Sequence, residues 1–91
     1  MDVKILGTGC ANCKKLYAVV EEALLQTGIQ AELSKVEDVQ AIMTYGVMST
    51  PALVIDETVV SAGKVPRVAK VSSWLASAAM KEQGGGVDER H

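Results

Sequence analysis

The sequence predicts a single α/β domain with the element order β-α-β-α-β-β-α. Two patterns support this class: short apolar runs typical of strands alternate with segments whose apolar residues recur at helical spacing. Glycines and prolines separate these segments at the expected element ends. The length of 91 residues is sufficient for one modest hydrophobic core, so we expect one domain.

The first half of the chain predicts a strand, a helix and a second strand. Residues 3–6 form a short apolar run, and the helical spacing that follows predicts a helix over residues 11–27. Gly28 is placed to end that helix in a left-handed conformation. Residues 29–36 alternate apolar and polar side chains, which predicts a strand with one face buried against a helix.

A short second helix is predicted after residue 36. Glu37 and Asp38 put negative charge at its start, where the helix dipole favours it, and Gly46 closes it. One side of this helix is expected to be buried, through Val39, Ile42 and Met43. Tyr45 has two open interpretations, a side chain resting on the edge of the core or a substrate contact.

A hairpin and a last helix complete the domain. Residues 52–55 are continuously apolar, as in an interior strand, and 58–61 return after a turn at residues 56–57. This turn lacks glycine, so a bulge or a longer loop is an alternative to the tightest hairpin.

The last predicted helix opens with Pro66 in its first turn, where a missing N–H is tolerated. Its apolar stripe consists of Val68, Val71, Leu75 and Ala78. Trp74 flanks the stripe and is expected to cover the core rather than to hold a ligand. We place the domain at residues 1–82 and expect a flexible tail at 83–91, which holds the sole histidine.

Both cysteines lie where the first strand gives way to the first helix. Cys10 is predicted at the N-terminus of the helix, where unpaired backbone amides stabilise an anion and so lower the pKa of a thiol. Cys10 is therefore the candidate nucleophile. Cys13 shares the apolar stripe of the helix and is the candidate sheltered, resolving thiol. Three positions apart on one turn, the pair can form a disulfide without rebuilding the backbone.

Composition and charge exclude several function classes. A formal net charge of −2 lacks the excess of basic residues that nucleic-acid binding favours. No apolar run approaches the length of a membrane span. The N-terminus lacks the basic and apolar regions of a signal peptide, so we expect a cytoplasmic protein. In a reducing compartment, a single cysteine pair indicates a cycling or metal-binding dithiol rather than a structural disulfide.

The element order and three motifs resemble the thioredoxin superfamily, over about residues 2–81. The nearest branch is that of small glutaredoxin-like redox-active disulfide proteins, also called thioredoxin-like family 3. The motifs are Gly7-Thr8-Gly9-Cys10 through Cys13, the segment from Gly46 to Asp56 with Thr50-Pro51, and Ser61-Ala62-Gly63-Lys64-Val65-Pro66.

This resemblance implies a minimal thioredoxin-like fold, a four-stranded mixed sheet with helices on both faces. The first two strands would be parallel, and the hairpin would add antiparallel beside the first strand. The Thr50–Pro51 bond would be cis and lie against the cysteines, leaving the Thr50 backbone free to pair with an extended substrate. The substrate-binding residues implied are Gly9, Ala11, Asn12, Thr50 and Pro51. Two departures from larger thioredoxins are Gly9 before the pair and Lys4 where those proteins bury an acid.

The leading functional hypothesis is a thiol–disulfide oxidoreductase that cycles Cys10 and Cys13 to reduce protein or small-molecule disulfides. No cofactor beyond this redox-active disulfide and no metal is expected. The expected partners are disulfide-containing proteins and an electron donor resembling thioredoxin reductase, with no nucleic acid or membrane partner. We expect a monomer that serves electron transport and redox homeostasis in the cell.

Two rival functions remain open. Copper chaperones of the heavy-metal-associated kind also carry two cysteines between a first strand and helix, and two thiolates can hold Cu(I). Their element order differs, because their first hairpin precedes the second helix. A structural zinc site needs four ligands, more than this chain readily supplies. The other rival is a non-catalytic thioredoxin-like adaptor that binds partners through the Thr50-Pro51 face.

Overall fold

The computed structural model describes residues 1–84 and has the predicted order of elements. The strands are β1 (Asp2–Leu6), β2 (Glu32–Val36), β3 (Ala52–Ile55) and β4 (Thr58–Ala62). The helices are α1 (Ala11–Thr27), α2 (Val39–Thr44) and α3 (Val68–Gly84). The sheet order is β2-β1-β3-β4, with β1 parallel to β2 and antiparallel to β3, and β4 antiparallel to β3. The expected mixed four-stranded sheet is confirmed.

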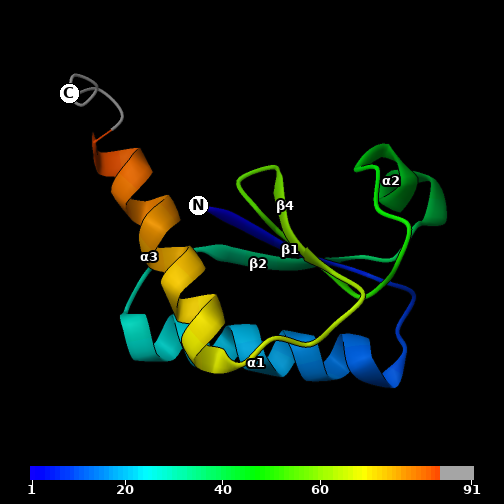
Figure 1. The fold of residues 1–91 in the computed structure, drawn as a ribbon, viewed down its shortest axis with the longest axis horizontal. Helices are drawn as coiled ribbons and strands as arrows, with labels where there is room; N and C mark the ends of the chain where they lie inside the picture. Colours follow the sequence, from blue (N-terminus) through cyan, green and yellow to red (C-terminus); the bar gives the residue numbers. More distant parts are fainter. Residues whose placement is uncertain (85–91) are drawn as a thin grey trace.

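Helices cover both faces of the sheet, as the resemblance stated above implies. Helices α1 and α3 pack on one face and α2 lies on the other (Figure 1). The larger core cluster lies between the sheet and α1 and α3, and consists of Val3, Ile5, Leu16, Val20, Ala23, Leu53, Ile55, Val71 and Leu75. The smaller cluster lies under α2 and consists of Leu6, Ile42, Ala52 and Val54. All four residues of β3 are buried, as predicted from its continuous apolar run.

Two element predictions need correction. The second strand starts at Glu32 rather than at residue 29, because β1 starts at Asp2, whose ladder partner is Glu32. Residues 29–31 precede the ladder and therefore have no β1 residue opposite them. Pro66 lies ahead of the third helix rather than in its first turn, since α3 begins at Val68.

The predicted buried side of α2 is also only partly correct. Ile42 is buried, whereas Val39 is 56% and Met43 66% exposed. A helix of six residues has fewer than two turns, so little of its surface can face the sheet.

The turn of the β3–β4 hairpin is the tight form rather than a longer loop, and the bulge lies within the strands. Asp56 and Glu57 form a two-residue turn with positive φ angles of 49° and 68°, the conformation of a tight hairpin. The register also shifts between Leu53 and Val54, which leaves Val60 of β4 as an extra, bulged residue.

The predicted domain limit at residue 82 falls inside α3, which continues to Gly84. The rest of the predicted tail, residues 85–91, lies outside the described residues. Within residues 1–84, no helix is long and apolar enough to cross a bilayer.

Candidate active site

The end of β1 and the start of α1 position the two thiols. The Gly7 N–H donates to the carbonyl of Val36 at 3.0 Å, which holds the end of β1 beside the end of β2. Cys10 is the N-cap of α1 in an extended conformation, and its carbonyl accepts the N–H of Lys14 at 3.1 Å. The helix therefore starts at the first thiol, as the sequence predicted, and Cys13 lies in its first turn.

The two sulfurs are adjacent but differ in environment. Cys10 is exposed and Cys13 is only 7% exposed, and their Sγ atoms are 2.6 Å apart. The backbone N–H of Cys13 donates to Cys10 Sγ at 3.3 Å. An attack of one sulfur on the other therefore needs little movement of the backbone.

Hydrogen bonding and burial shift the two thiol pKa values in opposite directions. The pKa of Cys10 is lowered, first by the hydrogen bond from the Cys13 side chain and then by that from the Cys13 backbone N–H. The pKa of Cys13 is raised, first by burial and then by its hydrogen bond to Cys10. At neutral pH the exposed thiol is thus the readier of the two to ionise.

Thr50 and Pro51 lie beside the buried thiol. The Thr50–Pro51 peptide bond is cis, Pro51 is buried and Thr50 is exposed. A Cβ atom built on Gly7 would collide with Cys13 Sγ and would lie 3.9 Å from the Cα of Pro51. Gly7 therefore lies close to both Cys13 and Pro51, so the β1–α1 junction and the segment before β3 come together here.

The other predicted site residues surround the first thiol on the surface. Gly9, Ala11 and Asn12 are exposed, and Gly9 has a φ angle of 90° that favours glycine. Within residues 1–84, no hydrogen bond is formed by the Thr50 backbone.

Lys4 and Tyr45, two residues considered from the sequence, lie elsewhere. The Lys4 ammonium contacts the Tyr45 hydroxyl at 3.0 Å and Glu57 at 2.8 Å, and Tyr45 donates to Glu57 at 2.9 Å. Tyr45 thus rests at the core edge under α2, the first of its two interpretations.

Sequence reasoning missed a small cavity behind the buried thiol. A volume of about 60 Å³ is lined by Cys13 together with Lys14, Lys35 and Glu37. Lys35 is near the end of β2 and Glu37 follows it. Because parallel strands bring their carboxyl ends to the same edge of a sheet, the predicted β1–β2 pair was the signal that could have identified both.

Comparison with known proteins agrees with this geometry. Residues 1–76 match a family model described as a thioredoxin domain. A thioredoxin of Methanocaldococcus jannaschii is 39% identical over 75 residues, which cover 82% of this chain and 86% of the relative. A thioredoxin of Methanothermobacter thermautotrophicus is 33% identical over 76 residues, or 84% of this chain and 99% of that protein.

The chain belongs to the thioredoxin family. It is a thiol–disulfide oxidoreductase, and its cysteine pair has the spacing and proximity that this chemistry requires. Family membership implies disulfide substrates and a reductase that returns electrons to the dithiol. The observed position of the hairpin, after α2, also differs from the element order of the rival copper chaperones.

Proposed function

We propose that Cys10 is the nucleophile and Cys13 the resolving thiol of this oxidoreductase. The observation that carries the assignment is the contrast between an exposed sulfur with a lowered pKa and a buried one 2.6 Å away with a raised pKa. The thiolate is the nucleophile in disulfide exchange, so the group that ionises more readily and meets solvent attacks first.

The reaction then balances in two steps. The Cys10 thiolate attacks one sulfur of a substrate disulfide, forms a mixed disulfide and expels the other substrate sulfur as a thiolate. Cys13 gives up its proton to solvent and attacks Cys10 Sγ, which releases the second substrate thiolate and closes the Cys10–Cys13 disulfide. Two electrons pass to the substrate, both released thiolates take up protons, and a reductase later restores the dithiol.

We further propose that the substrates are proteins whose extended segments pair with the backbone of Thr50. Thr50 is exposed, its backbone makes no hydrogen bond within the described residues, and it adjoins Pro51 beside Cys13. A strand-like substrate could add main-chain hydrogen bonds there. Gly9, Ala11 and Asn12 would contact the same segment beside the attacked sulfur. Met48, 98% exposed, offers an apolar contact two residues before Thr50.

The remaining proposals concern the setting of the reaction. We propose a cytoplasmic monomer that uses its own disulfide and no other cofactor, and takes electrons from a reductase resembling thioredoxin reductase. The lone cysteine pair, which in a reducing compartment favours a cycling dithiol, supports this proposal. Sedimentation of the reduced protein tests the monomer.

Turnover of 5,5′-dithiobis(2-nitrobenzoate) with single cysteine variants tests the two roles. We expect Cys10→Ser to lose turnover, because the remaining thiol is buried and holds its proton more tightly. We expect Cys13→Ser to release one equivalent of thionitrobenzoate and to stop with the second equivalent bound at Cys10, as mass spectrometry would show. Unchanged turnover in Cys10→Ser, or a trapped adduct at Cys13 instead, would contradict the assignment.

A further inference from the structure

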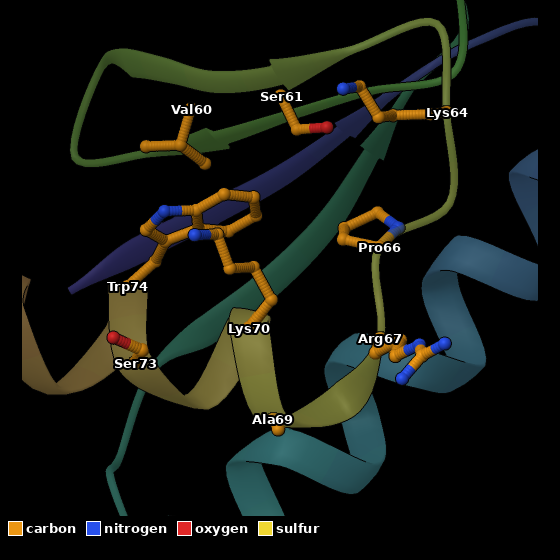
Figure 2. Close-up of a pocket in the computed structure, with 9 residues that line it drawn as sticks. All are labelled: Val60, Ser61, Lys64, Pro66, Arg67, Ala69, Lys70, Ser73 and Trp74. Carbon is orange, nitrogen blue, oxygen red and sulfur yellow. The ribbon is translucent and has the colours of Figure 1, made fainter.

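A second hollow lies away from the cysteine pair, between the edge strand β4 and the start of α3. Its volume is about 580 Å³, within the range of small-molecule sites. Figure 2 shows its walls, which come from β4, the loop after it and the first turns of α3. The residues that matter for its chemistry are Val60, Ser61, Lys64, Arg67, Lys70 and Trp74.

The bulge in β4 builds the strand wall of this pocket. Ser61 pairs with Leu53, a residue of the core under α1 and α3, so Ser61 lies on that face of the sheet. Val60 packs against the same core, whereas Val59 packs under α2. Two consecutive residues, Val60 and Ser61, thus share the α3 face, which regular alternation would not allow.

This arrangement leaves a buried hydroxyl without a partner. Ser61 is 8% exposed, and its Oγ forms no hydrogen bond within residues 1–84. Figure 2 shows its side chain on the side of β4 that faces Trp74 and Pro66, with the hydroxyl turned toward Lys64. An unpaired buried polar group costs free energy, so a ligand that bonds to this hydroxyl would recover part of that cost.

The rim of the pocket is positively charged. Lys64, Arg67 and Lys70 are exposed, and none pairs with a carboxylate in the part of the chain that the structure describes. The N-terminus of α3 adds to this potential, because the N–H of Val71 is the first to bond back, to Arg67 at 3.1 Å. Lys64, Arg67 and Lys70 therefore line one hollow beside the first turn of α3, which favours an anionic ligand.

The wall opposite the strand is aromatic and apolar. Trp74 lines this pocket and also a second hollow of about 390 Å³. Val60 and Pro66 complete the apolar lining, and the Lys70 ammonium lies 5.7 Å from the centroid of the Trp74 ring. A flat ring stacked on Trp74 would place an attached acid group near Lys70.

We propose that this pocket binds a small anion that carries an aromatic ring, the class that contains aryl phosphates and aryl carboxylates. The ring packs among Trp74, Val60 and Pro66, and the acid group meets Lys70, Arg67 and the first turn of α3. The Ser61 hydroxyl supplies a hydrogen bond. This binding function is separate from disulfide exchange and does not rest on the roles proposed for the cysteines.

Trp74 is the only tryptophan of the chain, so its fluorescence reports on the pocket directly. Phenyl phosphate and benzoate are titrated separately, and the tighter of the two identifies the preferred acid group. We expect saturable binding of at least one of them. Inorganic phosphate, which lacks the ring, and phenol, which lacks the acid group, should each bind at least about tenfold more weakly. The Cys10→Ser variant should bind as the natural protein does.

Matched variants then assign the binding to the pocket. Lys70→Gln should raise the Kd by about fivefold, the effect of one charge about 4 Å away in water. Ser61→Ala should also weaken binding, whereas Lys15→Gln, with the same charge change on α1, should leave the Kd within about twofold. The proposal is overturned if neither aryl anion binds saturably, if inorganic phosphate binds as tightly, or if Lys15→Gln and Lys70→Gln act alike.

Discussion

At the scale of single residues, one helical turn gives two identical side chains different chemistry. Cys10 stands outside the first turn of α1 and receives hydrogen bonds, whereas Cys13 points inward and loses contact with water. The lowered and raised pKa values follow from these two positions. The helical spacing of the sequence was enough to predict which thiol is exposed, because it placed Cys13 on the apolar stripe.

The pH dependence of alkylation tests this contrast. We expect iodoacetamide to modify Cys10 faster than Cys13 at neutral pH, with a midpoint below the usual pKa of a thiol. Cys13→Ala removes the hydrogen bond that lowers the Cys10 pKa most, so the midpoint should move upward and the rate at pH 7 should fall. Mass spectrometry of quenched samples gives both rates. An unchanged midpoint in Cys13→Ala would contradict the stated cause.

Gly7 is the residue whose role only the structure reveals. A methyl group there would collide with Cys13 Sγ. We expect Gly7→Ala to lower the free energy of unfolding by about 1–3 kcal/mol through overpacking, and to slow closure of the Cys10–Cys13 disulfide. Urea unfolding and timed oxidation followed by mass spectrometry measure the two effects.

Gly9→Ala is the matched control for that variant. Its Cβ would meet open space, but the φ angle of 90° makes alanine cost about 1–2 kcal/mol. We therefore expect a loss of stability with normal disulfide closure. If the disulfide closed at the same rate in Gly7→Ala and Gly9→Ala, the position of Cys13 would not depend on the space left by the missing side chain of Gly7.

At the scale of elements, prediction succeeded where the signal was local. The limits of α1 were correct because both ends carry local signals, the onset of helical spacing after Cys10 and a left-handed Gly28. The predicted start of β2 was wrong because pairing with β1 sets where β2 begins. The first residue of β1, Asp2, pairs with Glu32, and residues 29–31 carry no local signal that marks this limit. The burial predicted for Val39 and Met43 was wrong for a similar reason. Their exposure depends on how little of α2 contacts the sheet, which the sequence of α2 does not show.

A three-residue cluster joins elements in a way that the sequence did not reveal. Lys4 of β1, Tyr45 at the end of α2 and Glu57 of the hairpin turn bond to one another. The pKa of Glu57 is lowered, first by Lys4 and then by Tyr45, and that of Lys4 is raised above its usual range by the same contacts. Glu57 adopts a positive φ angle of 68° at the position where its carboxylate joins this cluster.

Glu57→Gln tests that linkage through pH. Because the pKa of Glu57 is lower in the folded state, its carboxylate stabilises the fold above its unfolded pKa, and that contribution is lost as the pH falls through the folded pKa. Glu57→Gln should therefore be less stable than the natural protein at pH 7, with a difference that shrinks in acid. Urea unfolding across pH measures it. Glu21→Gln, an exposed change of equal charge, is the control, and the same pH profile for both variants would contradict the cluster's role.

At the scale of the whole molecule, the active site is assembled from segments far apart in the chain. The β1–α1 junction, the Thr50–Pro51 segment and the end of β2 meet at one edge of the sheet. The sequence predicted the first two through motifs, and family resemblance supplied the cis bond and the sheet order, both confirmed. Lys35 and Glu37 were missed because they carry no motif. The pocket at Ser61 was missed because it depends on where the bulge falls in β4, which the sequence did not show.

The central claim is that Cys10 and Cys13 interconvert reversibly between dithiol and disulfide within one chain. A redox titration of the natural protein, quenched by alkylation and read by mass spectrometry, tests it most directly. We predict two populations, one with both thiols alkylated and one with an internal disulfide, whose ratio changes tenfold for about every 30 mV, as a two-electron couple requires. A chain that stays fully alkylated at every potential, or that forms only disulfides between chains, would contradict this account.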